Sequence, residues 1–95
     1  MTPLTPENAE IVALTALGWL VANEDLLPVF LGSSGLGEDD IRDRAHEPEF
    51  LASVVDFILM DDAWVLAFAQ FAGHAPEHLW RARAGLPGGA AVNWT

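Results

Sequence analysis

The chain has 95 residues, of which 52% are hydrophobic and only 19% are charged. It has no lysine and four arginines against fourteen acidic residues, so its formal net charge is −10. This negative field repels phosphate backbones and anionic lipid, which argues against nucleic-acid binding and membrane-surface binding. The absence of cysteine excludes disulfide, zinc-thiolate and thiol chemistry. The apolar excess favours self-association, for example as a homodimer, or binding to an unidentified protein partner.

The first predicted helix begins at Pro6, where the missing backbone donor costs nothing, and Thr5 is its predicted cap. The uncharged run over residues 11–22 is shorter than the ~20 residues that cross a bilayer. The N-terminal residues lack the basic region of a signal peptide, so we expect a cytoplasmic protein. Apolar residues recur at helical spacing along this helix, and the face they form is predicted to be core: Ile11, Leu14, Leu17, Leu20 and Val21.

Asn23 is the predicted cap of a second helix, and Glu24 and Asp25 are expected in its first turn. Pro28 is tolerated because it lies in or near that turn. The helix is expected to stop at Gly32, and the glycine-rich stretch that follows is predicted to be a loop.

A short third helix is predicted over residues 38–45, and it begins with three acidic residues that suit a helix N-terminus. Arg42 and Arg44 lie in its last turn, where positive charge suits the negative end of the helix dipole. Pro48 favours a new start, and the apolar spacing that follows predicts a fourth helix: Phe50, Leu51, Val54, Val55, Ile58 and Leu59.

Asp61 is predicted to end the fourth helix and to cap a fifth, which stops at Gly73. A sixth helix is predicted to open at Pro76 and to end at Gly85. The fold class is therefore all-α, a compact bundle of about six short helices. We expect an N-terminal extension over residues 1–5, one helical domain over residues 6–86, and a flexible tail over residues 87–95.

An internal repeat is visible when residues 18–48 are laid over residues 56–87 with one extra residue near Ala75. It predicts two pseudo-repeated units of three helices, over about residues 11–48 and 49–87, related by a pseudo-twofold axis. Seven aligned pairs are identical: Phe30/Phe68, Gly35/Gly73, Glu38/Glu77, Arg42/Arg81, Arg44/Arg83, Ala45/Ala84 and Pro48/Pro87.

Several strings in the chain are similar to the DUF3572 proteins of alphaproteobacteria: residues 16–20 (Ala-Leu-Gly-Trp-Leu), 23–27 (Asn-Glu-Asp-Leu-Leu), 30–31, 34–36, 42–45, 48–51 and 56–59. The resemblance covers roughly residues 9–86 and implies a bacterial helical domain. It carries no catalytic residue over. One departure is visible, because His74-Ala75-Pro76 stands where the family tends to have an acidic Leu-Asp-Pro-like entry to the last helix.

Two histidines, His74 and His78, are four residues apart, a spacing that places two imidazoles on one face of a helix and suits a metal ion. Pro76 is the predicted first helical residue, however, and this leaves His74 outside the helix. Exposed loop and helix histidines are the competing interpretation. No catalytic, cofactor-binding or metal-binding residue is assigned, and no cofactor is predicted.

Aromatic residues provide the main indication of function. Trp64, Phe68 and Phe71 follow one face of the fifth helix, which usually means core. Trp80 lies beside Arg81, and tryptophan with arginine is typical of interface hot spots. The candidate interaction surface is therefore Trp64, Phe71, Trp80 and Arg81, and the candidate structural arginines, which neutralise helix dipoles or pair with acids, are Arg42, Arg44 and Arg83.

These patterns predict a small acidic domain that is a non-enzymatic protein-protein interaction or regulatory adaptor module. The alternative is an activity that depends on a metal or a small ligand, using His74, His78 and neighbouring acids. Asp56 lies on the less apolar side of its helix, and it is expected to be solvated rather than a buried acid with a raised pKa.

Overall fold

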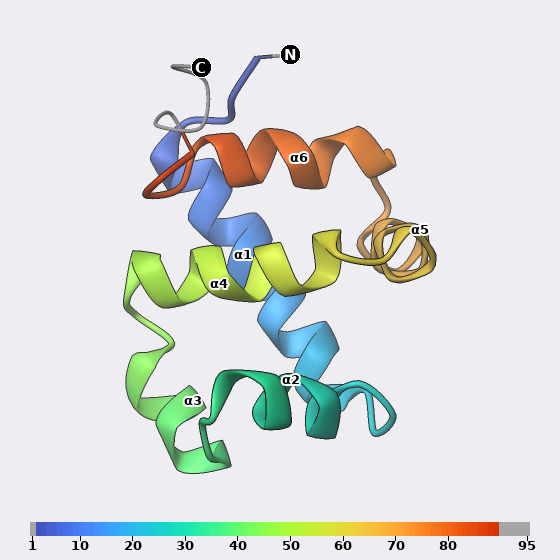
Figure 1. Ribbon diagram of the computed structural model, residues 1–95. Helices are drawn as coiled ribbons and strands as arrows, with labels where there is room; N and C mark the ends of the chain where they lie inside the picture. Colours follow the sequence, from blue (N-terminus) through green and yellow to red (C-terminus); the bar gives the residue numbers. More distant parts are fainter. Residues whose placement is uncertain (1, 90–95) are drawn as a thin grey trace.

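The computed structural model describes residues 2–89, and within them it contains six α-helices and no strand (Figure 1). This confirms the all-α prediction, whereas the twofold relation between the two units stays a prediction. The predicted tail residues Val92 and Trp94 lie outside the described residues. The helices are α1 (Pro6–Ala22), α2 (Leu27–Ser34), α3 (Glu38–Arg44), α4 (Pro48–Leu59), α5 (Asp62–Ala72) and α6 (Pro76–Ala84).

Side chains cap two helices at the predicted positions. The Thr5 hydroxyl accepts a hydrogen bond from the Asn8 N–H at 3.3 Å and so closes the start of α1. The Asp61 carboxylate accepts from the N–H groups of Ala63 at 2.8 Å and Trp64 at 3.3 Å at the start of α5. These caps fix where α1 and α5 begin.

The second helix differs from its prediction at both ends. Asn23 caps a turn rather than a helix, because its Oδ1 accepts from the N–H groups of Asp25 and Leu26 at 3.1 Å, and α2 begins only at Leu27. The prediction that the helix stops at Gly32 was wrong. The helix continues to Ser34 and ends at Gly35, whose φ of 75° is the left-handed conformation that glycine adopts without steric cost.

The central helix is α1, which packs against α2, α4, α5 and α6. In Figure 1, α4 crosses in front of α1, and α6 lies close to the N-terminal end of α1. The side of α1 that faces these neighbours is formed largely by alanine, and its buried residues are Ala9, Ala13, Ala16, Leu17 and Leu20. Small side chains allow close approach. At Gly85, just after α6, an added Cβ would lie 3.0 Å from the Ala9 Cβ of α1 and 2.3 Å from the carbonyl oxygen of Leu4, just before α1.

The predicted core face of α1 is only partly correct. Leu17 and Leu20 are buried, but the other three predicted core residues face outward: Ile11 is 61% exposed, Leu14 47% and Val21 45%. The reason is geometric, since the alanine side allows α4 and α6 to pack closer than a side with three large branched residues would. The large apolar residues are therefore left on the outer side.

Most of the core comes from α4, which buries seven of its twelve residues: Phe50, Leu51, Ala52, Val54, Val55, Phe57 and Ile58. Phe30 of α2 packs edge-on against Phe57 with ring centroids 5.2 Å apart, and Phe57 in turn stacks on Trp64 at 4.9 Å. These aromatic contacts join α2, α4 and α5 into one apolar interior.

The aromatic residues of α5 have different environments. Phe68 is fully buried and meets Trp19 of α1 edge-on, with ring centroids 5.7 Å apart. Trp64 is half-buried against Phe57, and Phe71, the second-last residue of α5, is 63% exposed. The core interpretation of this stripe therefore holds at Phe68 and fails at Phe71, because Ala69 and Ala72 form the inner side of the last turn and Phe71 lies on its outer side.

Among the described helices, none is by itself long and apolar enough to cross a membrane. One pair, α1 and α2, passes a test of length and composition when taken together, but its two helices are bent by 108° at their junction.

We expect Phe68→Ala to lower the free energy of unfolding by about 3–5 kcal/mol, because it leaves a cavity between α1 and α5. The matched control is Phe71→Ala on the same helix, which should change the free energy by less than about 0.5 kcal/mol. Urea unfolding followed by far-UV circular dichroism measures both. Equal losses would contradict the placement of Phe71 outside the core.

Candidate functional site

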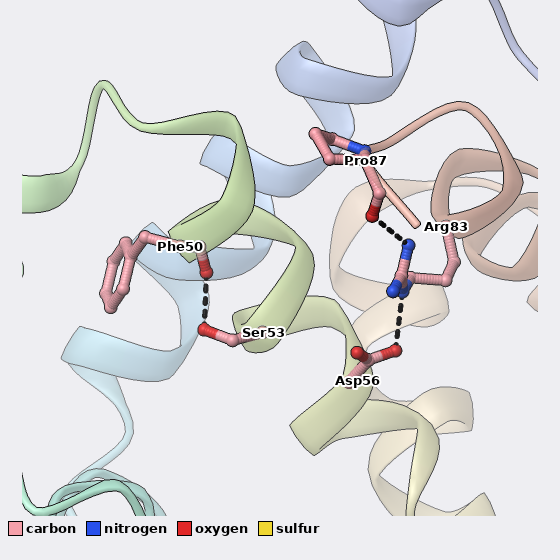
Figure 2. Close-up of polar contacts among 5 residues, drawn as sticks. All are labelled: Phe50, Ser53, Asp56, Arg83 and Pro87. Carbon is pink, nitrogen blue, oxygen red and sulfur yellow. Dashed lines mark hydrogen bonds and ion pairs between the residues drawn. The ribbon is translucent and has the colours of Figure 1, made fainter. Parts of the chain in front are cut away.

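The only ion pair among the described residues joins α4 to α6 (Figure 2). The Arg83 Nε donates to the Asp56 carboxylate at 2.6 Å, and Arg83 Nη1 donates to the Pro87 carbonyl at 2.9 Å. Arg83 is 18% exposed and Asp56 is 55% exposed, so water reaches this contact from the Asp56 side. Through Arg83 the contact joins α4 to the segment after α6, and the structural role of Arg83 stays a prediction that its substitution tests.

The other three arginines have other surroundings. Arg81 Nε donates to the Thr2 carbonyl at 2.8 Å, and the Leu4 N–H donates to the Arg81 carbonyl at 3.0 Å, so α6 holds the N-terminal segment. Arg42 and Arg44 lie exposed in the last turn of α3, and neither forms an ion pair within residues 2–89. Their structural role stays a prediction that rests on the helix dipole.

The two histidines are brought together by the turn after α5. His74 lies outside α6, as predicted, but the left-handed Gly73 (φ 77°) turns the chain so that the two imidazole centroids are 4.6 Å apart. The His74 ring also meets Phe68 in an edge-type contact, with ring centroids 5.4 Å apart. His74 Nδ1 lies 3.1 Å from the Ala75 carbonyl, and Nε2 is buried with no hydrogen-bond partner among the described residues.

Burial lowers the pKa of His78 below its ordinary value, and the neighbouring charges of His74 and Arg81 lower it further. The neutral imidazole is therefore favoured at pH 7, which is the form that binds a metal. The pair supplies two donors, whereas protein zinc sites normally use three or four. Within the part of the chain that the structure describes, no group of three or more His, Cys, Asp or Glu residues is placed to hold a metal.

The four residues of the candidate interaction surface have different environments. Phe71 faces a groove of about 440 Å³ together with Trp19, Glu24 and Asp25. Trp80 is exposed on α6, Arg81 is tied to the N-terminal segment, and Trp64 belongs largely to the core. Phe71 and Trp80 thus remain accessible to a partner, whereas most of Trp64 is not.

Sequence reasoning missed the outer side of α1, because it placed Ile11, Leu14 and Val21 in the core. The signal that could have identified this side is the spacing of alanine along the helix. Ala9, Ala13 and Ala16 recur at i, i+4 and i+7, which is the spacing of a helix face that packs closely against neighbours.

A protein-family comparison matches residues 6–89, nearly the whole described chain, to a model described as "Protein of unknown function (DUF3572)". The chain belongs to the DUF3572 family. Comparison with curated proteins and with solved structures finds no match. The family confirms the resemblance seen in the sequence, and the chemistry of this DUF3572 protein must be inferred from its own surface.

We expect Arg83→Ala to lower the free energy of unfolding by about 1 kcal/mol, because it removes the Asp56 pair and the Pro87 contact. Arg44→Ala is the matched control and should cost less than about 0.5 kcal/mol, since only the dipole contribution is lost. A double-mutant cycle with Asp56→Ala, read from urea unfolding, measures the coupling. Equal effects of the two arginine variants would contradict a specific role for the Arg83 contact.

Proposed function

We propose that this DUF3572 protein is a non-enzymatic protein-interaction module, an adaptor or regulator in the bacterial cytoplasm. The observation that carries the proposal is the number of large apolar side chains left on the outside of a small chain. All but Met60, which directly follows α4, lie on helices: Ile11, Leu14, Val21, Val29, Met60, Leu66, Phe71 and Trp80.

Two features of this exposed set support binding to another protein. Phe71 and Trp19 border the same groove, and aromatic side chains are common anchors at protein interfaces. Three of the residues, Ile11, Leu14 and Val21, lie along one side of α1, so they line one helix face rather than scattered points.

We expect the tagged protein to recover a stoichiometric partner from a lysate of its source cells. Phe71→Ala, and Trp80→Ala combined with Arg81→Ala, should each reduce that recovery, because each removes an exposed aromatic side chain of the kind that anchors a partner. Met60→Ala removes a still more exposed apolar side chain that is not aromatic and does not border the Phe71 groove, so it is the control and should leave the recovery unchanged. Recovery of the protein alone would contradict an adaptor role.

A second candidate is metal binding at the histidine pair, which is favoured by the adjacent imidazoles and by His74 Nε2, which has no hydrogen-bond partner within residues 2–89. It ranks below the first because the pair supplies only two donors. A metal-dependent or ligand-dependent activity would need further groups from water, from the ligand or from acids such as Glu77.

If this candidate is correct, calorimetric titration with Zn²⁺ at pH 7 should give saturable heat at one ion per chain. His78→Ala should abolish the heat, and the control His46→Ala should retain it, because His46 lies outside the pair. The binding should weaken as the pH falls toward 5, since protons compete for the imidazoles. A wild-type protein that gives no heat would contradict this candidate.

A further inference from the structure

The outer side of α1 is an apolar helix face for which the described chain provides no cover. No charged residue occurs over residues 11–22, so the polar stripe that a surface helix normally turns to solvent is missing here. The Thr15 hydroxyl does not supply one, because it donates to the Ile11 carbonyl of its own helix at 2.9 Å. Ile11, Leu14 and Val21 therefore meet water along three turns of the helix.

Two grooves flank the C-terminal half of this face. Val21 borders one groove of about 300 Å³, together with Leu27, Glu38, Ile41 and Arg42. The adjacent residue, Ala22, borders the groove of about 440 Å³ that contains Trp19, Asn23, Glu24, Asp25 and Phe71. A ridge with a groove on each side matches the shape of a helix-packing surface, in which side chains of a second helix enter the grooves.

The middle of the face is open to a second backbone. Gly18 lies between Leu14 and Val21, is exposed, and would have no atom within 4 Å of an added Cβ. Glycine destabilises a helix interior relative to alanine, and packing within the described chain does not require it at this position. Because glycine has no side chain, the backbone of a partner helix that crosses α1 at Gly18 can approach the α1 backbone closely.

The charges around the face indicate the chemistry of the partner. Glu24 and Asp25 border one groove and Glu38 borders the other, and all three are exposed. The one cation that borders either groove is Arg42. An apolar strip with acids at its edges complements a helix that has an apolar stripe flanked by lysine or arginine.

We propose that the outer side of α1, with its two grooves, binds a basic amphipathic helix of another protein. This inference rests on the proposed interaction function and gives it a surface and a class of partner. A second copy of the chain is the weaker occupant, since a twofold interface places the same surface on both sides. Glu24, Asp25 and Glu38 of one copy would then approach the acids of the other, in a chain with a net charge of −10.

The test uses the full-length protein and two synthetic helical peptides of about 18 residues, which is five helical turns. Both peptides have the same leucine and alanine stripe. One has arginine on the flanks of the stripe, and the other has glutamate at the same positions. Calorimetry should show that the basic peptide binds at least about tenfold more tightly than the acidic one. Its affinity should fall several-fold between about 50 mM and about 300 mM salt, because the edge charges are screened.

The variants locate the binding face. Gly18→Leu should weaken binding of the basic peptide at least about tenfold, because the added side chain holds the second backbone away from α1. The matched control is Gly32→Leu, a substitution at a second helical glycine that also has open space around it and that borders neither groove. It should leave the affinity unchanged. Glu24→Gln combined with Asp25→Asn should reduce both the affinity and its salt dependence.

Several outcomes would overturn the proposal: no binding of the basic peptide, equal binding of both peptides, or binding that Gly18→Leu leaves intact. Sedimentation of the protein alone tests one further outcome. If it shows a dimer that Gly18→Leu abolishes, the face binds a second copy of the chain, and the proposal is wrong. The interaction function can survive these results. A cellular partner that is recovered equally by the wild type and by Gly18→Leu would retain that function and place it on another surface.

Discussion

The close packing of α4 and α6 on the alanine side of α1 is the constraint on which the rest of the structure depends. Ala9, Ala13 and Ala16 are fully buried, and the approach at Gly85 leaves no room for a side chain. Once this side of α1 faces inward, Ile11, Leu14 and Val21 must face outward, because they lie on the opposite side of the same helix. The exposed strip of α1 is therefore a consequence of how the core is assembled, and any function of that strip depends on the same packing.

The sequence predicted the helix content and most helix starts, because those depend on local chemistry. Thr5, Asp61 and Pro76 act within a few residues of their own position, and each was correctly placed. The choice of the buried side of α1 failed because it is not local. The helix is apolar nearly all the way round, so hydrophobic periodicity does not distinguish its sides. Which side is buried depends instead on the size of the side chains that pack well against the neighbouring helices.

Sequence patterns identified single residues of the candidate sites but not their contacts. Arg83 was predicted to be structural and Asp56 to be solvated; the structure joins them in one contact across 27 residues of chain, and the structural role of Arg83 stays a prediction. That pairing depends on how α4 and α6 pack, which local patterns do not specify. The contact between the histidines was not predictable from local patterns either. His74 lies outside α6, but the left-handed conformation of Gly73 turns the chain so that His74 lies next to His78.

The acidity of the chain and its exposed apolar face have a combined effect that neither has alone. An apolar face on a neutral protein attracts any other apolar face, including its own copy, and so promotes aggregation. With a net charge of −10 and acids at the edges of the face, copies of this chain repel one another before their apolar surfaces meet. The same charges attract a cationic helix and speed its encounter with the face. Apolar contact would then supply most of the affinity and charge most of the selectivity, which is why discrimination between the two peptides is more informative than binding itself.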